Sequence, residues 1–250
     1  TVVPGSVTTT YPHNTVGYLV VTYPSGNRYR CTAFLVSAYV VLTAGHCIHN
    51  NERGGWVRAV EFYPGMYQDT VGGSVRQPYG RKTDFANLKA TQEWTQISGP
   101  DSFLVTEYRY DFAAIQFRTP FTFTSTFMPV VFNDVTSTVQ TEGYPGNLAG
   151  SSQSVYGMYA SSGAETSTFV RRSDIRQFAL ASSGGDSGSP FFVAGGAGLA
   201  NYLTGSLSYG NDDGTVAGGP WYDSWNRDLL TSWMMWTPAS AASPSPAPTA

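Results

Sequence analysis

A serine among glycines and a histidine after an apolar run are the residues here whose types and settings suit nucleophilic chemistry. Ser187 lies in the run Gly-Gly-Asp-Ser-Gly-Ser-Pro over residues 184–190. Such a loop lets backbone N–H groups turn inward and bind the anionic oxygen that forms when a serine attacks a carbonyl. His46 follows the apolar run 39–42, and imidazole can accept a serine proton near neutral pH. The pair predicts a hydrolase with a serine nucleophile and a histidine base.

The order of histidine, acid and serine along the chain restricts the architecture of such a site. Sites of this kind occur in three chain orders on unrelated folds. The order acid, histidine, serine is excluded because the first carboxylate of the chain is Glu52, whereas the last histidine is His49. The order serine, acid, histidine is excluded because no histidine follows Ser187. The remaining order is His46, then an acid, then Ser187.

Asp111 is the predicted acid among the thirteen carboxylates between His46 and Ser187. It opens the apolar run 112–117, so it is about to be buried, and an unpaired buried charge is costly. We therefore expect Asp111 to have a partner such as an imidazole. Asp84 and Asp101 remain alternatives for the acid.

Cys31 and Cys47 are the only cysteines, and the second directly follows the candidate histidine. Free thiols would be expected in a cytosolic enzyme, but few charges with many aromatic and turn residues favour an extracellular protein. We therefore predict a disulfide, which would contribute roughly 3 kcal/mol by closing a loop of about 15 residues. A zinc site from His46, His49 and Cys47 is the alternative. We expect no metal, because too few ligands cluster there, and we expect His13 and His49 at the surface.

The charge pattern excludes some partners. Charged residues make up 12% of the chain, the net charge is −3, and no dense Lys/Arg run occurs, so nucleic acid is a poor partner. No apolar run reaches the ~18 to 20 residues that span a bilayer. The chain opens Thr-Val-Val-Pro without Met or an apolar segment. We expect a secreted mature form from which a targeting segment has been removed.

Short strand-like runs separated by turn residues recur along the chain, which has 27 Gly and 15 Pro. They lie at 17–21, 28–34, 39–42, 57–62, 111–117, 135–141, 191–194 and 203–207. This spacing predicts an all-β sandwich or pair of barrels. Apolar residues at helical spacing predict one helix over 225–236, after Asp223 or Ser224 as N-cap. Residues 237–250 are Pro, Ala, Ser and Thr and read as a tail.

Four motifs together resemble a known family, the chymotrypsin-like serine peptidases, and within it the bacterial glutamyl endopeptidase branch. The motifs are Thr-Ala-Gly-His-Cys at 43–47, Tyr-Asp-Phe-Ala-Ala-Ile at 110–115, Gly-Tyr-Pro-Gly at 143–146, and the serine loop. Thr-Val-Val-Pro at 1–4 also resembles the mature start of that branch. The likeness runs from about residue 1 to 236.

The resemblance implies a fold of two antiparallel six-stranded β-barrels, packed face to face, with a C-terminal α-helix. The first barrel would cover residues 1–125 and carry His46 and Asp111. The second would cover 126–236, carry Ser187 and the specificity pocket, and end in the helix. Residues 237–250 would form the tail.

The resemblance also implies a role for each residue of the site. Ser187 would be the nucleophile, His46 the base and then the acid, and Asp111 the group that fixes the imidazole tautomer. The N–H groups of Gly185 and Ser187 would form the oxyanion hole. The expected activity is peptide-bond hydrolysis through an acyl-enzyme, by a monomer that acts on polypeptides without a cofactor. The segment 205–210 would bind substrate through Ser208, Tyr209 and Gly210, with Ser208 also supporting Asp111.

The preference for the residue before the cut stays open between Glu and an apolar side chain. The trypsin branch has an aspartate six places before the serine, where this chain has Ala181, so Arg or Lys is not expected. Ser182 could donate to a carboxylate at the base of the pocket. The glutamyl branch typically has a histidine on the pocket wall, where this chain has Leu207 and Ser208. A positive partner for Glu would then be the Thr1 amine.

Two other functions compete with peptide hydrolysis. A binding protein on an inactive peptidase scaffold usually lacks one of the three catalytic residues, and this chain keeps all three. An esterase would share the chemistry.

Overall fold

The computed structural model describes residues 1–68, 72–97, 105–146, 156–166, 174–195 and 200–239. The first half of the chain forms one six-stranded antiparallel sheet with the order β6-β1-β2-β3-β8-β7. Its strands are β1 (Val16–Thr22), β2 (Arg28–Leu35), β3 (Val40–Thr43), β6 (Ala59–Pro64), β7 (Phe85–Ala90) and β8 (Ala113–Phe117).

The two faces of this sheet differ because side chains alternate along each strand. One face is apolar and buries residues such as Leu19, Val21 and Phe62 in a closed core. On the opposite face, Tyr18 pairs across the strands with Thr32 and Tyr63, and Val20 with Arg30 and Glu61. This more polar face turns toward the second half of the chain, where Tyr18 packs edge-on against the Tyr144 ring.

The second half divides into two antiparallel sheets. A four-stranded sheet has the order β10-β9-β12-β13, and a three-stranded sheet has the order β11-β15-β14. A bridge between Gly205 and Trp221 links them. The strands are β9 (Thr138–Gly143), β10 (Tyr159–Ala164), β11 (Ile175–Phe178), β12 (Pro190–Val193), β13 (Tyr202–Ser206), β14 (Tyr209–Gly210) and β15 (Ala217–Pro220). The prediction of an all-β chain with antiparallel strands and a C-terminal helix is confirmed, and in this half the strands form a four-stranded and a three-stranded sheet.

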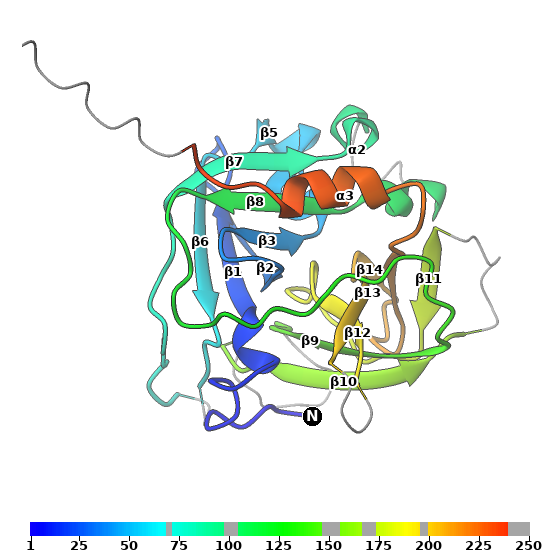
Figure 1. Cartoon of the computed structure of the whole chain (residues 1–250), viewed down its shortest axis with the longest axis horizontal. Coiled ribbons are helices and arrows are strands. Elements are labelled where there is room, and N and C mark those ends of the chain that lie inside the picture. Colours follow the sequence, from blue (N-terminus) through cyan, green and yellow to red (C-terminus); the bar gives the residue numbers. More distant parts are fainter. Residues whose placement is uncertain (69–71, 98–104, 147–155, 167–173, 196–199, 240–250) are drawn as a thin grey trace, which may run out of the picture.

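A shared core joins the two halves. Phe34 and Leu42 of the first sheet belong to the same buried cluster as Tyr144, Phe192 and Leu203 of the second half. Figure 1 shows β9, β10, β12 and β13 beneath the first sheet, with the N-terminus beside β10. The expected boundary between 125 and 126 falls in the segment from β8 to β9.

Helices are few among the described residues, and α3 (Arg227–Met234) is the predicted C-terminal one. It lies along β8 in Figure 1, buries Leu230 and Trp233, and receives a hydrogen bond from the Gln116 amide to the Trp233 carbonyl at 3.0 Å. The helix is shorter than the predicted 225–236. The chain just before it is occupied by local turns, in which Asp223 accepts from the Trp225 N–H and Asn226 accepts from the Asp223 N–H. Most of the predicted tail lies outside the described residues.

The remaining elements are short. They are η1 (His13–Thr15), α1 (Gly45–Ile48), β4 (His49–Asn50), η2 (Asn51–Arg53), β5 (Gly55–Trp56), α2 (Gln92–Gln96) and η4 (Val105–Tyr110). None of the helices in the described ranges has the length and apolar character needed to cross a lipid bilayer.

Candidate active site

His46 lies in α1, directly after β3, and is fixed by Asp111 through two hydrogen bonds. The His46 backbone N–H donates to Asp111 Oδ1 at 2.7 Å, and its ring Nδ1 lies 2.7 Å from Asp111 Oδ2. A carboxylate only accepts, so the proton between them belongs to Nδ1. Nε2 is then the ring atom that can take a proton. The Gly45 backbone allows this approach, because a Cβ there would lie 3.0 Å from Asp111 Oδ1.

Asp111 lies between η4 and β8 and is fully buried. Besides the two donors of His46, the Ser208 hydroxyl donates to its Oδ2 in a short hydrogen bond. These three donors compensate the carboxylate for its lost hydration. The expected contact between Ser208 and Asp111 is therefore present in the structure.

The disulfide between Cys31 and Cys47 is present, with an S–S distance of 1.96 Å. It joins β2 to α1, next to His46. The sulfurs of both cysteines and a ring nitrogen of His46 lie within 4.8 Å of one another. Sulfurs joined in a disulfide are not thiolate ligands, so this cluster does not fit a zinc ion.

The serine loop is packed between the two halves of the chain. The Thr32 N–H of β2 donates to the Ser187 carbonyl at 2.8 Å, and the Gly188 N–H donates to the Leu207 carbonyl at 2.7 Å. Gly188 has φ +85°, and a Cβ on it would lie 2.2 Å from Thr43 Oγ1. The loop therefore requires glycine at this position.

The N–H groups of the loop fall into two sets. Those of Asp186, Gly188 and Ser189 donate to backbone carbonyls of the chain. Those of Gly184, Gly185 and Ser187 have no acceptor in the part of the chain that the structure describes, and the Gly185 and Ser187 groups are the pair predicted to form the oxyanion hole. Gly185 has φ +110°, a conformation that glycine adopts without strain. A pair of free donors beside a serine hydroxyl can bind an oxyanion.

Asp186 precedes Ser187 and is buried. Its carboxyl accepts the Ser183 N–H at 3.1 Å. Burial raises the pKa of Asp186 to about 7, and the Ser183 hydrogen bond only partly opposes this.

The predicted pocket residues lie in two groups. Tyr209 and Gly210 form β14, which pairs with β15, and the Tyr209 ring packs 4.4 Å from that of Tyr108. Ser182 is buried, and its hydroxyl donates to the Val216 carbonyl at 3.0 Å. That donor is already used, so it is not directed at a substrate carboxylate as expected. Ala181 is exposed, and its N–H donates to Ser161 Oγ at 3.1 Å.

The Thr1 ammonium donates to the Ala160 carbonyl at 2.7 Å. Thr1 and Ala181 line the same small cavity, together with Ser161 and Asp186. The N-terminal residues reach this place because Val2 bridges to Tyr159 at the start of β10.

The other histidines and acids lie apart from this arrangement. His49 is buried rather than at the surface, with its ring edge-on to Trp56 at 4.8 Å, and burial lowers the pKa of His49. His13 Nδ1 lies 2.8 Å from the buried Glu142 carboxylate, a contact that its sequence neighbours did not indicate. Asp84 binds Lys82 and Thr119, so it is engaged elsewhere. Asp101 lies outside the described residues.

Sequence reasoning missed two residues that position the histidine. The Tyr23 hydroxyl donates to the His46 carbonyl at 2.9 Å. Trp94 is buried against the glycine before His46, where a Cβ would lie 2.9 Å from its ring. Both come from other parts of the chain, and no local pattern signals them.

Comparison with known proteins identifies the family. Residues 6–220 match the family model described as Trypsin. The chain therefore belongs to the trypsin family, which has the chymotrypsin-like fold.

Two curated relatives are bacterial peptidases. A glutamyl endopeptidase of Bacillus licheniformis is 26% identical over 235 residues, which are 90% of this chain and 65% of that protein. An extracellular metalloprotease of Bacillus subtilis is 32% identical over 114 residues, which are 44% of this chain and 31% of that protein. The chain thus spans less than two thirds of the length of each.

Solved structures agree on the fold. A Glu endopeptidase in complex with MPD aligns with a TM-score of 0.72 and 21% identity, covering 94% of this chain and 96% of that one. The protease Anisep from Arthrobacter nicotinovorans aligns with a TM-score of 0.69 and 23% identity, covering 88% and 95%. The fold is therefore chymotrypsin-like. The sequence similarity to a glutamyl endopeptidase agrees with the branch that the motifs indicate.

Proposed function

We propose that this chain is a secreted endopeptidase in which Ser187 is the nucleophile, His46 the general base and Asp111 the group that orients the base. The observation that carries the proposal is the combination of two features on neighbouring segments, since Cys47 Sγ, next to His46, lies 3.7 Å from the Ser187 carbonyl oxygen. Asp111 holds the His46 imidazole with Nε2 free to accept, and the N–H groups of Gly185 and Ser187 lack acceptors among the described residues. The first feature activates a hydroxyl and the second binds an oxyanion.

The reaction follows from these groups. The Ser187 hydroxyl attacks the peptide carbonyl while its proton passes to His46 Nε2, and the negative oxygen that forms is bound by the N–H groups of Gly185 and Ser187. His46 then gives the proton to the leaving amine, which breaks the C–N bond and leaves an ester on Ser187. Water, deprotonated by His46, hydrolyses that ester. Asp111 stays ionised and stabilises the imidazolium in both halves of the cycle.

The acyl half of the substrate would lie along Ser208, Tyr209 and Gly210. Ser208 is tied to Asp111, so a peptide bound to this segment would be held at a fixed distance from the imidazole. Its side chain before the cut would point toward Ala181. The expected partners are polypeptides, and the expected assembly is a monomer.

We propose cleavage after Glu or an apolar residue, and not after Arg or Lys. Ala181 offers no negative charge to a basic side chain. For Glu, the Thr1 ammonium is the candidate counter-charge, supported by its position at the cavity that Ala181 also lines. One of its hydrogens is used by Ala160, and two remain for a carboxylate. The relative from Bacillus licheniformis carries the name glutamyl endopeptidase.

This specificity is tested with peptides that differ only in Glu, Phe, Leu or Arg before the cut. The enzyme is prepared with Thr1 as first residue and with two added residues before it. If Thr1 is the counter-charge, the extension lowers kcat/KM for cleavage after Glu about tenfold or more, because the unpaired carboxylate loses its hydration at a cost of several kcal/mol. The value of kcat/KM for cleavage after Phe should change little. Equal loss for Glu and Phe would exclude Thr1. Efficient cleavage after Arg would exclude the proposed pocket.

Secretion is supported by the disulfide, because such bonds persist in oxidising compartments. One relative is also named an extracellular enzyme. Detection of the protein in the culture medium of its source, with Cys31 and Cys47 linked, tests this assignment.

The catalytic proposal is tested by Ser187→Ala, with Ser189→Ala as matched control. Ser189 lies in the same loop, and its hydroxyl has no hydrogen-bond partner in the described residues. We expect the first variant to lose at least about 10⁵ in kcat because the triad acts as a unit, and the second to stay within about threefold of the parent. A folded Ser187→Ala that still cleaves at the parental rate would contradict the mechanism. An inactive parent would favour the rival function, a binding protein on a peptidase fold.

A further inference from the structure

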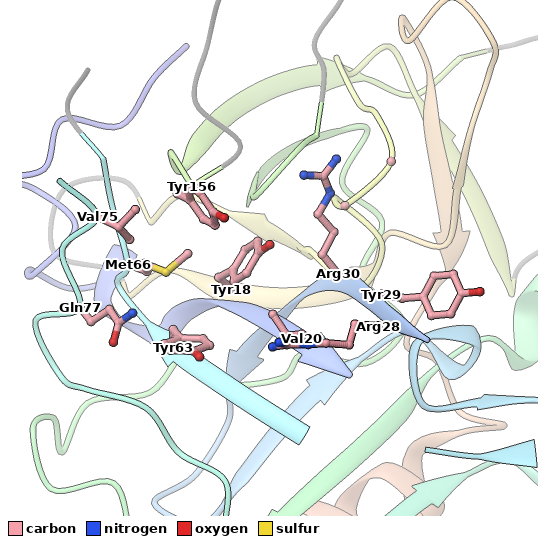
Figure 2. Close-up of a pocket in the computed structure, with 12 residues that line it drawn as sticks. Tyr18, Val20, Arg28, Tyr29, Arg30, Tyr63, Met66, Val75, Gln77 and Tyr156 are labelled. Carbon is pink, nitrogen blue, oxygen red and sulfur yellow. The ribbon is translucent and has the colours of Figure 1, made fainter. Parts of the chain in front are cut away.

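A cleft of about 770 Å³ lies beside the serine loop. Its floor is the polar face of the first sheet, with Tyr18 and Val20 of β1, Arg30 of β2 and Tyr63 of β6. Gly184 and Gly185 of the serine loop close one end. Figure 2 shows these side chains, with Arg30 rising from β2 beside Tyr18.

The position of the cleft relative to Ser187 indicates which part of a substrate would enter it. On one side of Ser187, the Gly188 N–H donates to the Leu207 carbonyl. Leu207 leads into the segment that we propose binds the acyl half of the substrate, the residues before the cut. On the other side, the Ser187 carbonyl accepts a hydrogen bond from the Thr32 N–H of β2. A peptide that crosses Ser187 from Ser208 therefore continues over β2, on the side of Arg30. Extended peptide advances about 3.3 Å per residue, so the first residues after the cut reach this cleft.

Arg30 gives the cleft an uncompensated charge. It is half-buried and packs on the loop backbone, since a Cβ on Gly185 would lie 3.5 Å from Arg30 Nε. In the described ranges, no carboxylate lies within ion-pair distance of Arg30, and its guanidinium interacts with the neutral Tyr18 hydroxyl. The neighbouring Arg28 differs, because it is exposed and pairs with Glu61 at 2.5 Å. Glu61 also binds Arg81 at 3.2 Å, so this group too carries a net positive charge.

We propose that this cleft binds the leaving half of the substrate and that Arg30 selects an acidic side chain at the first or second residue after the cut. The inference rests on the proposed function. A half-buried guanidinium presents a planar fork of donors that matches a carboxylate, and partial burial reduces screening by solvent. The rings of Tyr18, Tyr63 and Tyr156 provide walls for the methylene groups of the same side chain.

The test uses internally quenched peptides that share one residue before the cut and carry Glu or Gln at the first or second position after it. At one of these positions, we expect kcat/KM to be about tenfold higher for Glu than for Gln, and the ratio to fall as salt is raised. Arg30→Gln should bring the ratio near 1, and Arg30→Lys should keep part of it. The matched control Arg58→Gln removes an exposed positive charge that does not line the cleft, and should keep the ratio of the parent.

A ratio near 1 at both positions in the parent would overturn the inference, and so would a preference that survives in Arg30→Gln. If Arg30→Gln does not fold, the Glu-to-Gln ratio of kcat/KM in the parent enzyme and the salt dependence of this ratio still test the inference. A small ester substrate without a peptide leaving group separates the two proposals. If the parent hydrolyses the ester but shows no Glu preference, only the inference fails. If it hydrolyses neither ester nor peptide, the proposed function fails.

Discussion

At the scale of single residues, Asp111 shows how the candidate site is held together. Its carboxylate receives donors from α1 and from Ser208, which belong to the two halves of the chain. Burying such a group without these donors would cost several kcal/mol. The bonds that stabilise the buried charge are the same ones that fix the His46 ring, so stability and the proposed chemistry depend on one set of contacts.

Asp186 supports a prediction on pH. Its carboxyl has a pKa raised by burial to about 7, against 3.8 for an exposed aspartate. The folded state therefore binds more protons than the unfolded state between about pH 4 and 7, and the free energy of unfolding falls as pH rises through this window. The contribution of this one group is up to about 4 kcal/mol. Above about pH 7, the pKa of Asp186 in the folded state, this contribution to the free energy of unfolding is fully lost.

The change is measured by urea unfolding at pH 5 and pH 8 in a Ser187→Ala background, which prevents self-digestion. Asp186→Asn keeps an acceptor for the Ser183 N–H but removes the titration. We expect the variant to lose less free energy of unfolding than its parent between the two pH values. An identical loss in both proteins would show that Asp186 is not the titrating group.

The sequence could predict the residues of the candidate site better than their surroundings. Chain order alone restricted the acid to the stretch between His46 and Ser187, and the apolar run after Asp111 selected one carboxylate. Contacts between distant segments have no local pattern. The burial of His49, the Tyr23 hydrogen bond and the engagement of Ser182 by Val216 could therefore not be predicted.

At the scale of elements, strands rich in apolar residues were predicted more accurately than strands rich in small or polar residues. Strands with continuous or alternating apolar residues, such as β1, β2, β3 and β8, lie close to their predicted positions. Strands with many small or polar residues were missed, among them β10 and β15, whose sequences are Tyr-Ala-Ser-Ser-Gly-Ala and Ala-Gly-Gly-Pro. These strands are fixed by pairing with neighbours, so their own side chains carry little signal.

The serine loop yields a prediction from two glycines. At Gly188, φ is +85° and a Cβ would lie 2.3 Å from the Thr32 carbonyl, whereas a Cβ at Gly184 would meet nothing within 4 Å. We expect Gly188→Ala to lower the free energy of unfolding by about 2 kcal/mol or more and to cost at least about 100-fold in kcat, because the loop must shift. The control Gly184→Ala should change stability by under about 1 kcal/mol. Equal stability and activity in the two variants would contradict this description of the loop.

At the scale of the whole molecule, the two halves contribute different residues of the candidate site. His46 and Asp111 come from the first half, and Ser187 and Ser208 from the second. The core cluster that contains Phe34, Tyr144 and Phe192, among others, joins the two halves from which these residues come. The Tyr144 hydroxyl, which donates to the Met66 carbonyl at 2.8 Å, adds a polar tie across the same core. The candidate site therefore depends on the packing of both halves.

The central claim is that Ser187 is a nucleophile activated by His46, and labelling with a fluorophosphonate tests it most directly. Such a reagent reacts rapidly only with an activated serine. We expect one equivalent of label per chain, located on Ser187 by peptide mapping, with labelling abolished in Ser187→Ala and slowed at least about 10³-fold in His46→Ala. Absence of label on the folded parent, label on another serine, or unchanged labelling of His46→Ala would contradict the account.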